Sequence, residues 1–203
     1  MSAWRALAAA CALTLLGGSL PPGFAWAQHG APMARTVLTA TTPETQLVDQ
    51  EGRRFAFAEL RGKAVLVAFI YTSCHHVCPL IFDSVSAVQA RARAQGLRDI
   101  AAVFVTVDPE IDTPEILKRY AERRGADPAT TAFLTGRDAD LQAVWDAFGL
   151  RIRRLGRGLV DHPPLTFLAD AQGTVRYRYL GTLLDSEVVL ADLRSLQRIA
   201  LKD

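Results

Sequence analysis

The residues of this sequence best suited to chemistry are two cysteines, Cys74 and Cys78, which stand four positions apart. If the chain is close to helical from Cys74 onwards, this spacing puts both sulfurs on one face. A helix N-terminus favours the thiolate over the thiol through its dipole and its free N–H groups. A thiolate is both a ligand for soft metals and a nucleophile, so the pair fits metal binding or thiol-disulfide exchange. A structural disulfide is the third possibility, although so small a loop removes little entropy from the unfolded chain.

His162 is the candidate for a third functional residue. It comes shortly before a predicted strand, and in the expected fold that strand neighbours the one ending at Tyr71, so its loop can approach the cysteines. Two thiolates and one imidazole form a soft ligand set that suits Cu(I) and accepts Cu(II). Zinc usually takes a fourth ligand, which His75, His76 or Asp161 could supply. From the residues alone, His162 fits an ordinary loop histidine equally well.

Simpler roles explain the other polar residues near the cysteines. We expect His75 and His76 to face solvent and Val77 to point inward. Three acidic residues follow a predicted strand between Asp108 and Asp112. Helix capping and helix-dipole effects account for two of them, so no active role is expected there. No Ser-His-Asp arrangement, phosphate loop or paired-carboxylate site stands out in the sequence.

The segments around the cysteine loop predict an α/β domain. The apolar run over residues 64–70 leads into the loop and is typical of a strand buried on both faces, as is the run over residues 100–107. Apolar residues at helical spacing, with caps and stop signals, predict helices over residues 79–96, 114–124, 138–149 and 185–200. Turn signals predict hairpins around residues 50–52, 156–158 and 170–173.

Parallel βα units followed by a β-β-α ending are the pattern of a thioredoxin-like fold. We therefore predict a central mixed sheet flanked by helices, with an N-terminal hairpin and an inserted hairpin before His162. The chain has 203 residues, half of them hydrophobic, which is enough for one such domain. Its net charge of +2 argues against nucleic acid as a partner, because such proteins usually carry a strongly basic face.

The N-terminus is typical of an exported protein. Residues 6–20 are apolar, and Arg5 is the only charged residue before position 35. Pro21-Pro22-Gly23 interrupts this run, and Ala25-Trp26-Ala27 then fits a small-x-small cleavage site. We predict that residues 1–27 are a signal peptide. An uncleaved N-terminal anchor is the alternative, because the uncharged stretch is just long enough to span a bilayer.

The rest of the chain divides into two predicted parts. Residues 28–45 are rich in Ala, Thr and Pro without an apolar period, so we expect a flexible tether. Residues 46–203 are expected to form the single folded domain. Export places this domain in the bacterial periplasm, either soluble or tethered to the inner membrane, where disulfides are allowed.

Four motifs, in order, make the chain resemble the Sco/SenC family of copper chaperones. They are Phe69-Ile70-Tyr71-Thr72-Ser73-Cys74-x-x-x-Cys78-Pro79, Val107-Asp108-Pro109-Glu110-Ile111-Asp112-Thr113-Pro114, Val160-Asp161-His162 and Thr166-Phe167-Leu168-Ala169-Asp170. The resemblance covers roughly residues 44–200. It implies a thioredoxin-like fold that holds one copper ion, Cu(I) or Cu(II), on Cys74, Cys78 and His162.

The resemblance also implies a function. Members of this family help to assemble the dinuclear copper centre of cytochrome c oxidase subunit II. The expected partners are therefore that subunit and another periplasmic copper carrier. We expect a monomer, with membrane proximity through an uncleaved N-terminus as the alternative to a soluble domain.

An enzymatic alternative stays open. Some family members are thought to deliver copper and others to reduce the target's cysteines, so a thiol-disulfide reductase using Cys74 and Cys78 is the alternative to a non-enzymatic chaperone. The usual two-residue redox spacing is absent, which favours copper binding. Two departures from the family pattern are His75-His76-Val77 between the cysteines and Pro163-Pro164 after the histidine. The second resembles the often-cis proline of thiol-disulfide oxidoreductases.

Overall fold

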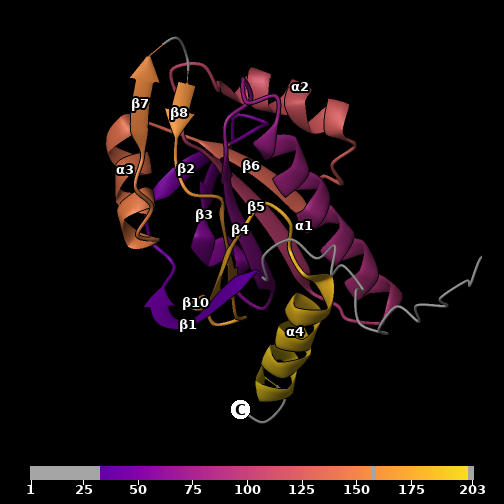
Figure 1. Cartoon of the computed structure of the whole chain (residues 1–203). Helices are drawn as coiled ribbons and strands as arrows, with labels where there is room; N and C mark the ends of the chain where they lie inside the picture. Colours follow the sequence, from indigo (N-terminus) through magenta and orange to yellow (C-terminus); the bar gives the residue numbers. More distant parts are fainter. Residues whose placement is uncertain (1–32, 157–158, 201–203) are drawn as a thin grey trace, which may run out of the picture. The chain divides into compact units, whose positions relative to one another are not determined.

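A mixed sheet of eight strands forms the centre of the domain (Figure 1). The computed structural model describes residues 33–156 and 159–200, so the predicted export segment over residues 1–27 lies outside the described residues. The strand order is β1-β10-β9-β4-β5-β6-β2-β3. The strands are Ala34–Thr41 (β1), Gln46–Asp49 (β2), Arg54–Ala56 (β3), Ala64–Ile70 (β4), Ile100–Thr106 (β5), Thr131–Thr135 (β6), Leu165–Ala169 (β9) and Thr174–Leu180 (β10). A separate hairpin consists of Arg153–Gly156 (β7) and Leu159–Asp161 (β8).

Helices cover both faces of this sheet. They are Val77–Ala94 (α1), Pro114–Arg124 (α2), Asp138–Ala147 (α3) and Ser186–Ala200 (α4), with a short 3₁₀ helix, Phe57–Leu60 (η1). Phe82 of α1 and Tyr120 of α2 contact the ring of Phe133, with centroids 6.0 and 5.8 Å away. Phe148, next to α3, contacts Phe69 on the opposite face at 5.5 Å. In the described ranges, no helix is long and apolar enough to cross a membrane.

The two central strands explain why the cysteine loop starts where it does. Every residue of β4 and β5 is buried, and the strands run parallel with Ala64 opposite Ile100 and Ile70 opposite Thr106. Strand β9 pairs antiparallel with the other edge of β4. The end of β4, the end of β5 and the beginning of β9 therefore meet at one end of the sheet. This arrangement confirms the thioredoxin-like fold and all three predicted hairpins.

The prediction of a flexible tether is wrong for residues 34–41. These residues form β1 at the edge of the sheet. This strand pairs antiparallel with β10, with Ala34 opposite Leu180. Thr36 and Leu38 are half-buried, whereas Val37 between them is 66% exposed. Because an edge strand packs on one face only and carries small polar residues there, its apolar period is too weak to identify from sequence. The part of the tether before Met33 lies outside the described residues.

Partly buried polar contacts help to hold β1 in place. Both Arg35 Nε and Arg35 Nη2 donate to the carboxylate of Asp192 in α4, each at 2.7 Å. Tyr179 of β10 donates its hydroxyl to the same carboxylate at 2.8 Å. The Arg35 guanidinium also lies 4.2 Å from the ring centroid of Tyr177. The N-terminal strand is therefore an integral part of the domain, tied to both the sheet and the last helix.

Candidate metal centre

The two cysteines lie where β4 gives way to α1. After Tyr71 the chain turns, and the N–H of Cys74 donates to the Tyr71 carbonyl at 3.2 Å. Helix α1 then begins at Val77, two residues before the expected Pro79. The N–H of Cys78, in its first turn, points at the sulfur of Cys74 across 3.4 Å. Both cysteines are free thiols; Cys78 is 1% exposed and Cys74 is half-buried.

The pair is electrostatically asymmetric. A hydrogen bond from the Cys78 thiol and the backbone N–H groups at the start of α1 lower the pKa of Cys74 to about 4, against the opposing effect of burial. The hydrogen bond with Cys74 and burial raise the pKa of Cys78 well above its usual range. At neutral pH the charge therefore lies on the Cys74 sulfur and the proton on the Cys78 sulfur. This is the effect that a helix N-terminus is expected to have on a nearby thiol.

His162 follows β8 and has a defined orientation. Its Nδ1 lies 3.1 Å from the carbonyl oxygen of Pro163. Because a carbonyl can only accept, Nδ1 carries the hydrogen, and Nε2 keeps a lone pair for a ligand. Burial lowers the pKa of His162, so its ring is neutral at neutral pH. Pro163 and Pro164 do not reproduce a cis proline, since none of the described peptide bonds is cis.

Tyr71 connects His162 with the cysteines. Its ring centroid lies 6.3 Å from that of His162 in an edge-to-face contact. Burial, and then the charge of Cys74, raise the pKa of Tyr71. The fold thus brings the three predicted ligands to one end of the sheet. Across residues 33–156 and 159–200, however, no group of three or more His, Cys, Asp and Glu side chains is arranged to hold a metal ion. Cys74, Cys78 and His162 therefore stay a predicted ligand set.

The chemical groups of the three predicted ligands nevertheless suit a soft metal. One thiolate, one thiol that becomes a thiolate on losing its proton, and one neutral imidazole match the preferences of copper better than those of a hard cation. His75 and His76 are exposed, as expected. The prediction that Val77 points inward is wrong, since its side chain is 41% exposed. The reason is that α1 begins at Val77 itself, and its inward face starts with Cys78.

The roles of the acidic residues that follow β5, Asp108 and Asp112, were not predicted from the sequence. Asp112 is fully buried and accepts hydrogen bonds from the N–H of Thr72 at 3.1 and 3.2 Å and from the Thr72 hydroxyl. Asp108 is also buried and accepts from Arg154 at 3.1 Å. Neither aspartate is the N-cap of α2, because the hydroxyl of Thr113 caps that helix. That Thr113 already fills the cap position was the available signal that Asp112 serves another purpose.

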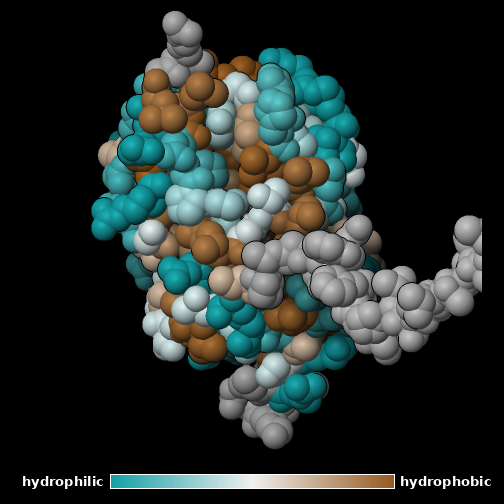
Figure 2. All heavy atoms as spheres, viewed as in Figure 1, coloured by the Kyte–Doolittle hydropathy of each residue, from teal (hydrophilic) through white to brown (hydrophobic). Residues whose placement is uncertain are grey.

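Most of the large exposed apolar side chains lie at the end of the sheet that carries the cysteines. Figure 2 shows apolar surface over the β7–β8 hairpin at the upper left, and more beside the start of α1. The side chains at this end that are exposed by 41–65% are Val77, Leu80, Ile111, Leu155, Leu159, Leu180 and Leu183. Apolar surface gathered around a reactive group is typical of a contact with another protein.

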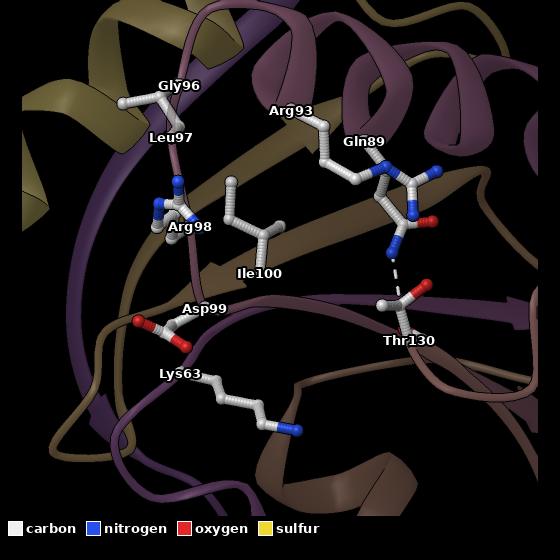
Figure 3. A pocket seen from close by; sticks show the side chains of 9 residues that line it. All are labelled: Lys63, Gln89, Arg93, Gly96, Leu97, Arg98, Asp99, Ile100 and Thr130. Atoms are coloured by element: carbon white, nitrogen blue, oxygen red, sulfur yellow. Dashed lines mark hydrogen bonds between the residues drawn. The ribbon is translucent and has the colours of Figure 1, made fainter.

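A pocket of about 480 Å³ lies at the other end of the sheet (Figure 3). Its lining includes Lys63, Arg93 and Arg98, and Gln89 closes one side through a hydrogen bond to the Thr130 carbonyl at 3.2 Å. These residues surround the beginnings of β4 and β5, whereas the cysteine loop follows the end of β4. The pocket is therefore separate from the candidate metal centre.

Comparison with known proteins gives consistent results. The family model described as SCO1/SenC matches residues 34–198, a range that includes all three predicted ligands. A SCO2-like protein of Rickettsia typhi is 32% identical over 142 residues, which cover 66% of this chain and 68% of that protein. A SCO1/SenC family lipoprotein from Bacillus anthracis is 27% identical, with a TM-score of 0.73 over 80% of this chain and 98% of that one. ScoI of Bradyrhizobium japonicum, solved with copper bound, is 30% identical, with a TM-score of 0.66 over 77% and 99%.

Proposed function

This chain belongs to the SCO1/SenC family, and from that premise we propose that it is a metallochaperone carrying one copper ion, Cu(I) or Cu(II), on Cys74, Cys78 and His162. The family resemblance implies that the carried copper serves to assemble the dinuclear copper centre of cytochrome c oxidase subunit II. That subunit and another periplasmic copper carrier are the proposed partners. The copper is cargo, so the protein needs to bind it firmly and also to release it.

The observation that carries this proposal is the asymmetric cysteine pair, together with an oriented, neutral histidine at the same end of the sheet. The Cys74 sulfur is charged at neutral pH and can bind a cation without first losing a proton. His162 keeps its Nε2 lone pair because Nδ1 is committed to Pro163. Cys78 holds its proton, so binding through both sulfurs releases one proton per copper at neutral pH.

The surroundings of the cysteines support a protein partner. Val77 and Leu80 lie in the first turn of α1, and Ile111 lies in the loop after β5, all with exposed side chains. A folded partner that covers them would bury apolar surface and exclude water from the half-buried Cys74 sulfur. Direct transfer between two thiolate sites requires such an approach.

An extracytoplasmic location is part of the proposal. It rests on the N-terminal sequence, where residues 1–27 have the pattern of a signal peptide or an anchor. It also fits the resemblance to the Bacillus anthracis lipoprotein. We propose the bacterial periplasm, with the domain soluble or tethered to the inner membrane.

Anaerobic copper titration tests the function. The reduced protein is mixed with copper, freed of excess, and analysed for copper content, for affinity against a chelator and for thiolate-to-Cu(II) charge transfer. We expect one copper per chain in the wild type and an affinity more than about tenfold lower in His162→Ala. His75→Ala is the matched control, because that imidazole is exposed. Equal affinity in wild type and His162→Ala would rule out the three-ligand site.

A second function is favoured by the same asymmetry. A half-buried thiolate at Cys74 is the arrangement of a nucleophile, and a buried thiol at Cys78 is that of a resolving cysteine. In this alternative the Cys74 sulfur attacks a target disulfide and forms a mixed disulfide. Cys78 then attacks the Cys74 sulfur, loses its proton to solvent and releases the reduced target. The protein ends oxidised and requires an external reductant thiol.

A further inference from the structure

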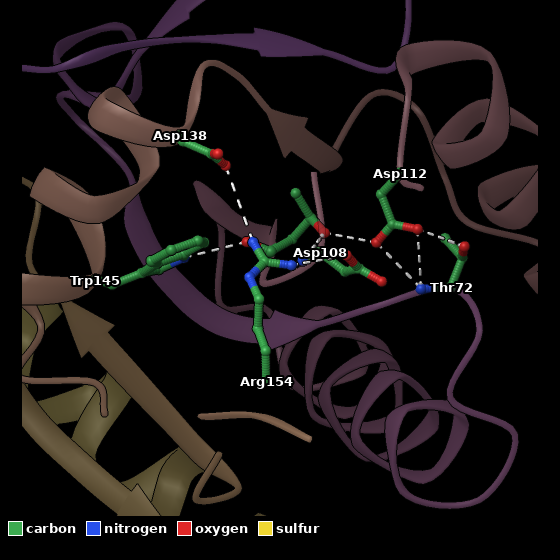
Figure 4. Close-up of polar contacts among 7 residues, drawn as sticks. Thr72, Asp108, Asp112, Asp138, Trp145 and Arg154 are labelled. Atoms are coloured by element: carbon green, nitrogen blue, oxygen red, sulfur yellow. Dashed lines mark hydrogen bonds and ion pairs between the residues drawn. The ribbon is translucent and has the colours of Figure 1, made fainter. Parts of the chain in front are cut away.

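The segment between β5 and α2 is bound to the cysteine loop through Asp112. Its buried carboxylate accepts from both the N–H and the hydroxyl of Thr72, which stands two residues before Cys74. Figure 4 shows Asp112 facing Thr72 across this contact. Hydrogen bonds in a buried, low-dielectric environment are stronger than in water and fix geometry. Asp112 therefore sets the direction in which the chain leaves β4 on its way to Cys74.

The same segment is bound to the hairpin that carries His162. Asp108, 3% exposed, accepts from Arg154 of β7 at 3.1 Å. Arg154 lies opposite Val160 in β8, and that strand leads to His162. The other end of the Arg154 guanidinium faces Asp138 at 3.9 Å, at the start of α3 (Figure 4).

Thr106 joins the two contacts at the end of β5. Its hydroxyl donates to Asp112 at 2.5 Å and accepts from the N–H of Asp108 at 2.9 Å. Its carbonyl accepts from the indole N–H of Trp145 at 3.1 Å. A single buried hydroxyl thus hydrogen-bonds to both aspartates, to the carboxylate of Asp112 and to the backbone N–H of Asp108.

We infer that the segment Asp108–Asp112 is a two-sided bracket that sets the position of His162 relative to Cys74. The aspartates act through Thr72 and Arg154 rather than on the sulfur or the imidazole, so they are positioning residues. The bracket compensates for the lack of a direct strand pairing between β8 and the cysteine loop within the described residues. The inference rests on the proposed function only where copper affinity is concerned.

Hydrogen exchange on the reduced, metal-free protein tests the two sides separately. We expect Asp112→Asn and Thr72→Val to speed amide exchange in residues 71–78 by about tenfold, because each change removes part of the hydrogen bonding that anchors the loop. We expect Arg154→Ala to do the same in residues 159–162, and Arg154→Lys to restore most of the protection. The matched control is Arg176→Ala, which removes the partner of another buried aspartate, Asp170, far from the cysteines.

Copper affinity then measures the consequence for the site. Replacing groups that orient metal ligands typically lowers affinity about 10–100-fold, and we expect this in Asp112→Asn and Arg154→Ala but not in Arg176→Ala. Unchanged exchange in the two loops, or the same change in the control, would overturn the bracket. So would wild-type copper affinity in both site variants. If the wild type itself binds no copper, the proposed function fails, and the exchange data still decide for or against the bracket.

Discussion

The backbone N–H of Cys78 points at the sulfur of Cys74 across 3.4 Å. At this position most helices use the oxygen of a Ser, Thr, Asp or Asn side chain to satisfy the free N–H groups of the first turn. Here His76 occupies the N-cap without a side-chain hydrogen bond. The Cys74 sulfur accepts a hydrogen bond from the first turn instead. A thiolate accepts such hydrogen bonds more strongly than a thiol does, so the fold favours the thiolate form of Cys74.

The first prediction concerns the pH dependence of Cys74. Its pKa of about 4, lowered from an ordinary value of 9.0, means that the thiolate persists through mildly acidic conditions. Alkylation of the reduced, metal-free protein by iodoacetamide, followed by mass spectrometry, should stay fast down to about pH 5 and reach half its maximum near pH 4. The rate falls below that because protonation removes the nucleophile. A half-maximum near pH 8–9 would contradict the proposed stabilisation of the thiolate.

A second prediction follows from the difference in exposure between the two cysteines. With oxidised glutathione, the Cys74 thiolate forms a mixed disulfide and releases one glutathione thiol. Cys78 then displaces the second glutathione and leaves a Cys74–Cys78 disulfide. We expect Cys78→Ser to accumulate the mixed disulfide and Cys74→Ser to form almost none, because Cys78 is 1% exposed. Intact-mass analysis distinguishes these species, and comparable trapping in both variants would disprove the assigned order of attack.

The third prediction separates the loop histidines from the site. His75 and His76 are exposed, so replacing both with alanine removes no buried contact. We expect one copper per chain to remain, with an affinity within about threefold and a free energy of unfolding within about 0.5 kcal/mol of the wild type. Copper titration and urea unfolding measure these quantities. Loss of copper comparable to that in His162→Ala would mean that the loop supplies an imidazole ligand.

The fourth prediction concerns β1. Arg35→Ala leaves the buried Asp192 carboxylate with the hydroxyl of Tyr179 as its remaining partner. We expect the free energy of unfolding in urea to fall by about 2–3 kcal/mol, because an unpaired buried charge is costly. Arg137→Ala breaks an exposed pair with Asp140 and should leave the free energy of unfolding close to that of the wild type. Equal losses in the two variants would mean that β1 is not held by this contact.

How well each strand could be predicted depended on its burial. The runs over residues 64–70 and 100–107 are buried on both faces, so their composition alone identified β4 and β5. Strand β1 lies at the edge, and its pattern is diluted by exposed Thr and Val side chains. Its pairing with β10 and the contact of Arg35 with Asp192, 157 residues away, hold it in place, and no local pattern reveals such contacts.

Some residues of the candidate site could likewise be predicted from the sequence, and others could not. Cys74, Cys78 and His162 could be proposed from residue type and spacing, because their chemistry is their own. The asymmetry of the cysteines required knowing where α1 begins. Asp112 acts across a separation of 40 residues, so its burial against Thr72 became visible only in three dimensions. Residues that support a site in this way have no recognisable motif, because a carboxylate from any part of the chain could make the same contact.

The edge position of β1 matters if the predicted N-terminal anchor is retained. Ala34 enters the sheet opposite Leu180, at the end where β4 leads into the cysteine loop. Residues 28–33 separate the predicted export segment from this strand, and six residues span at most about 21 Å. We therefore predict that a retained anchor would limit how far the domain can move from the lipid, so that its search for a membrane-bound target would be largely two-dimensional. A cleaved one would leave the same surface free to diffuse and to meet carriers from any direction.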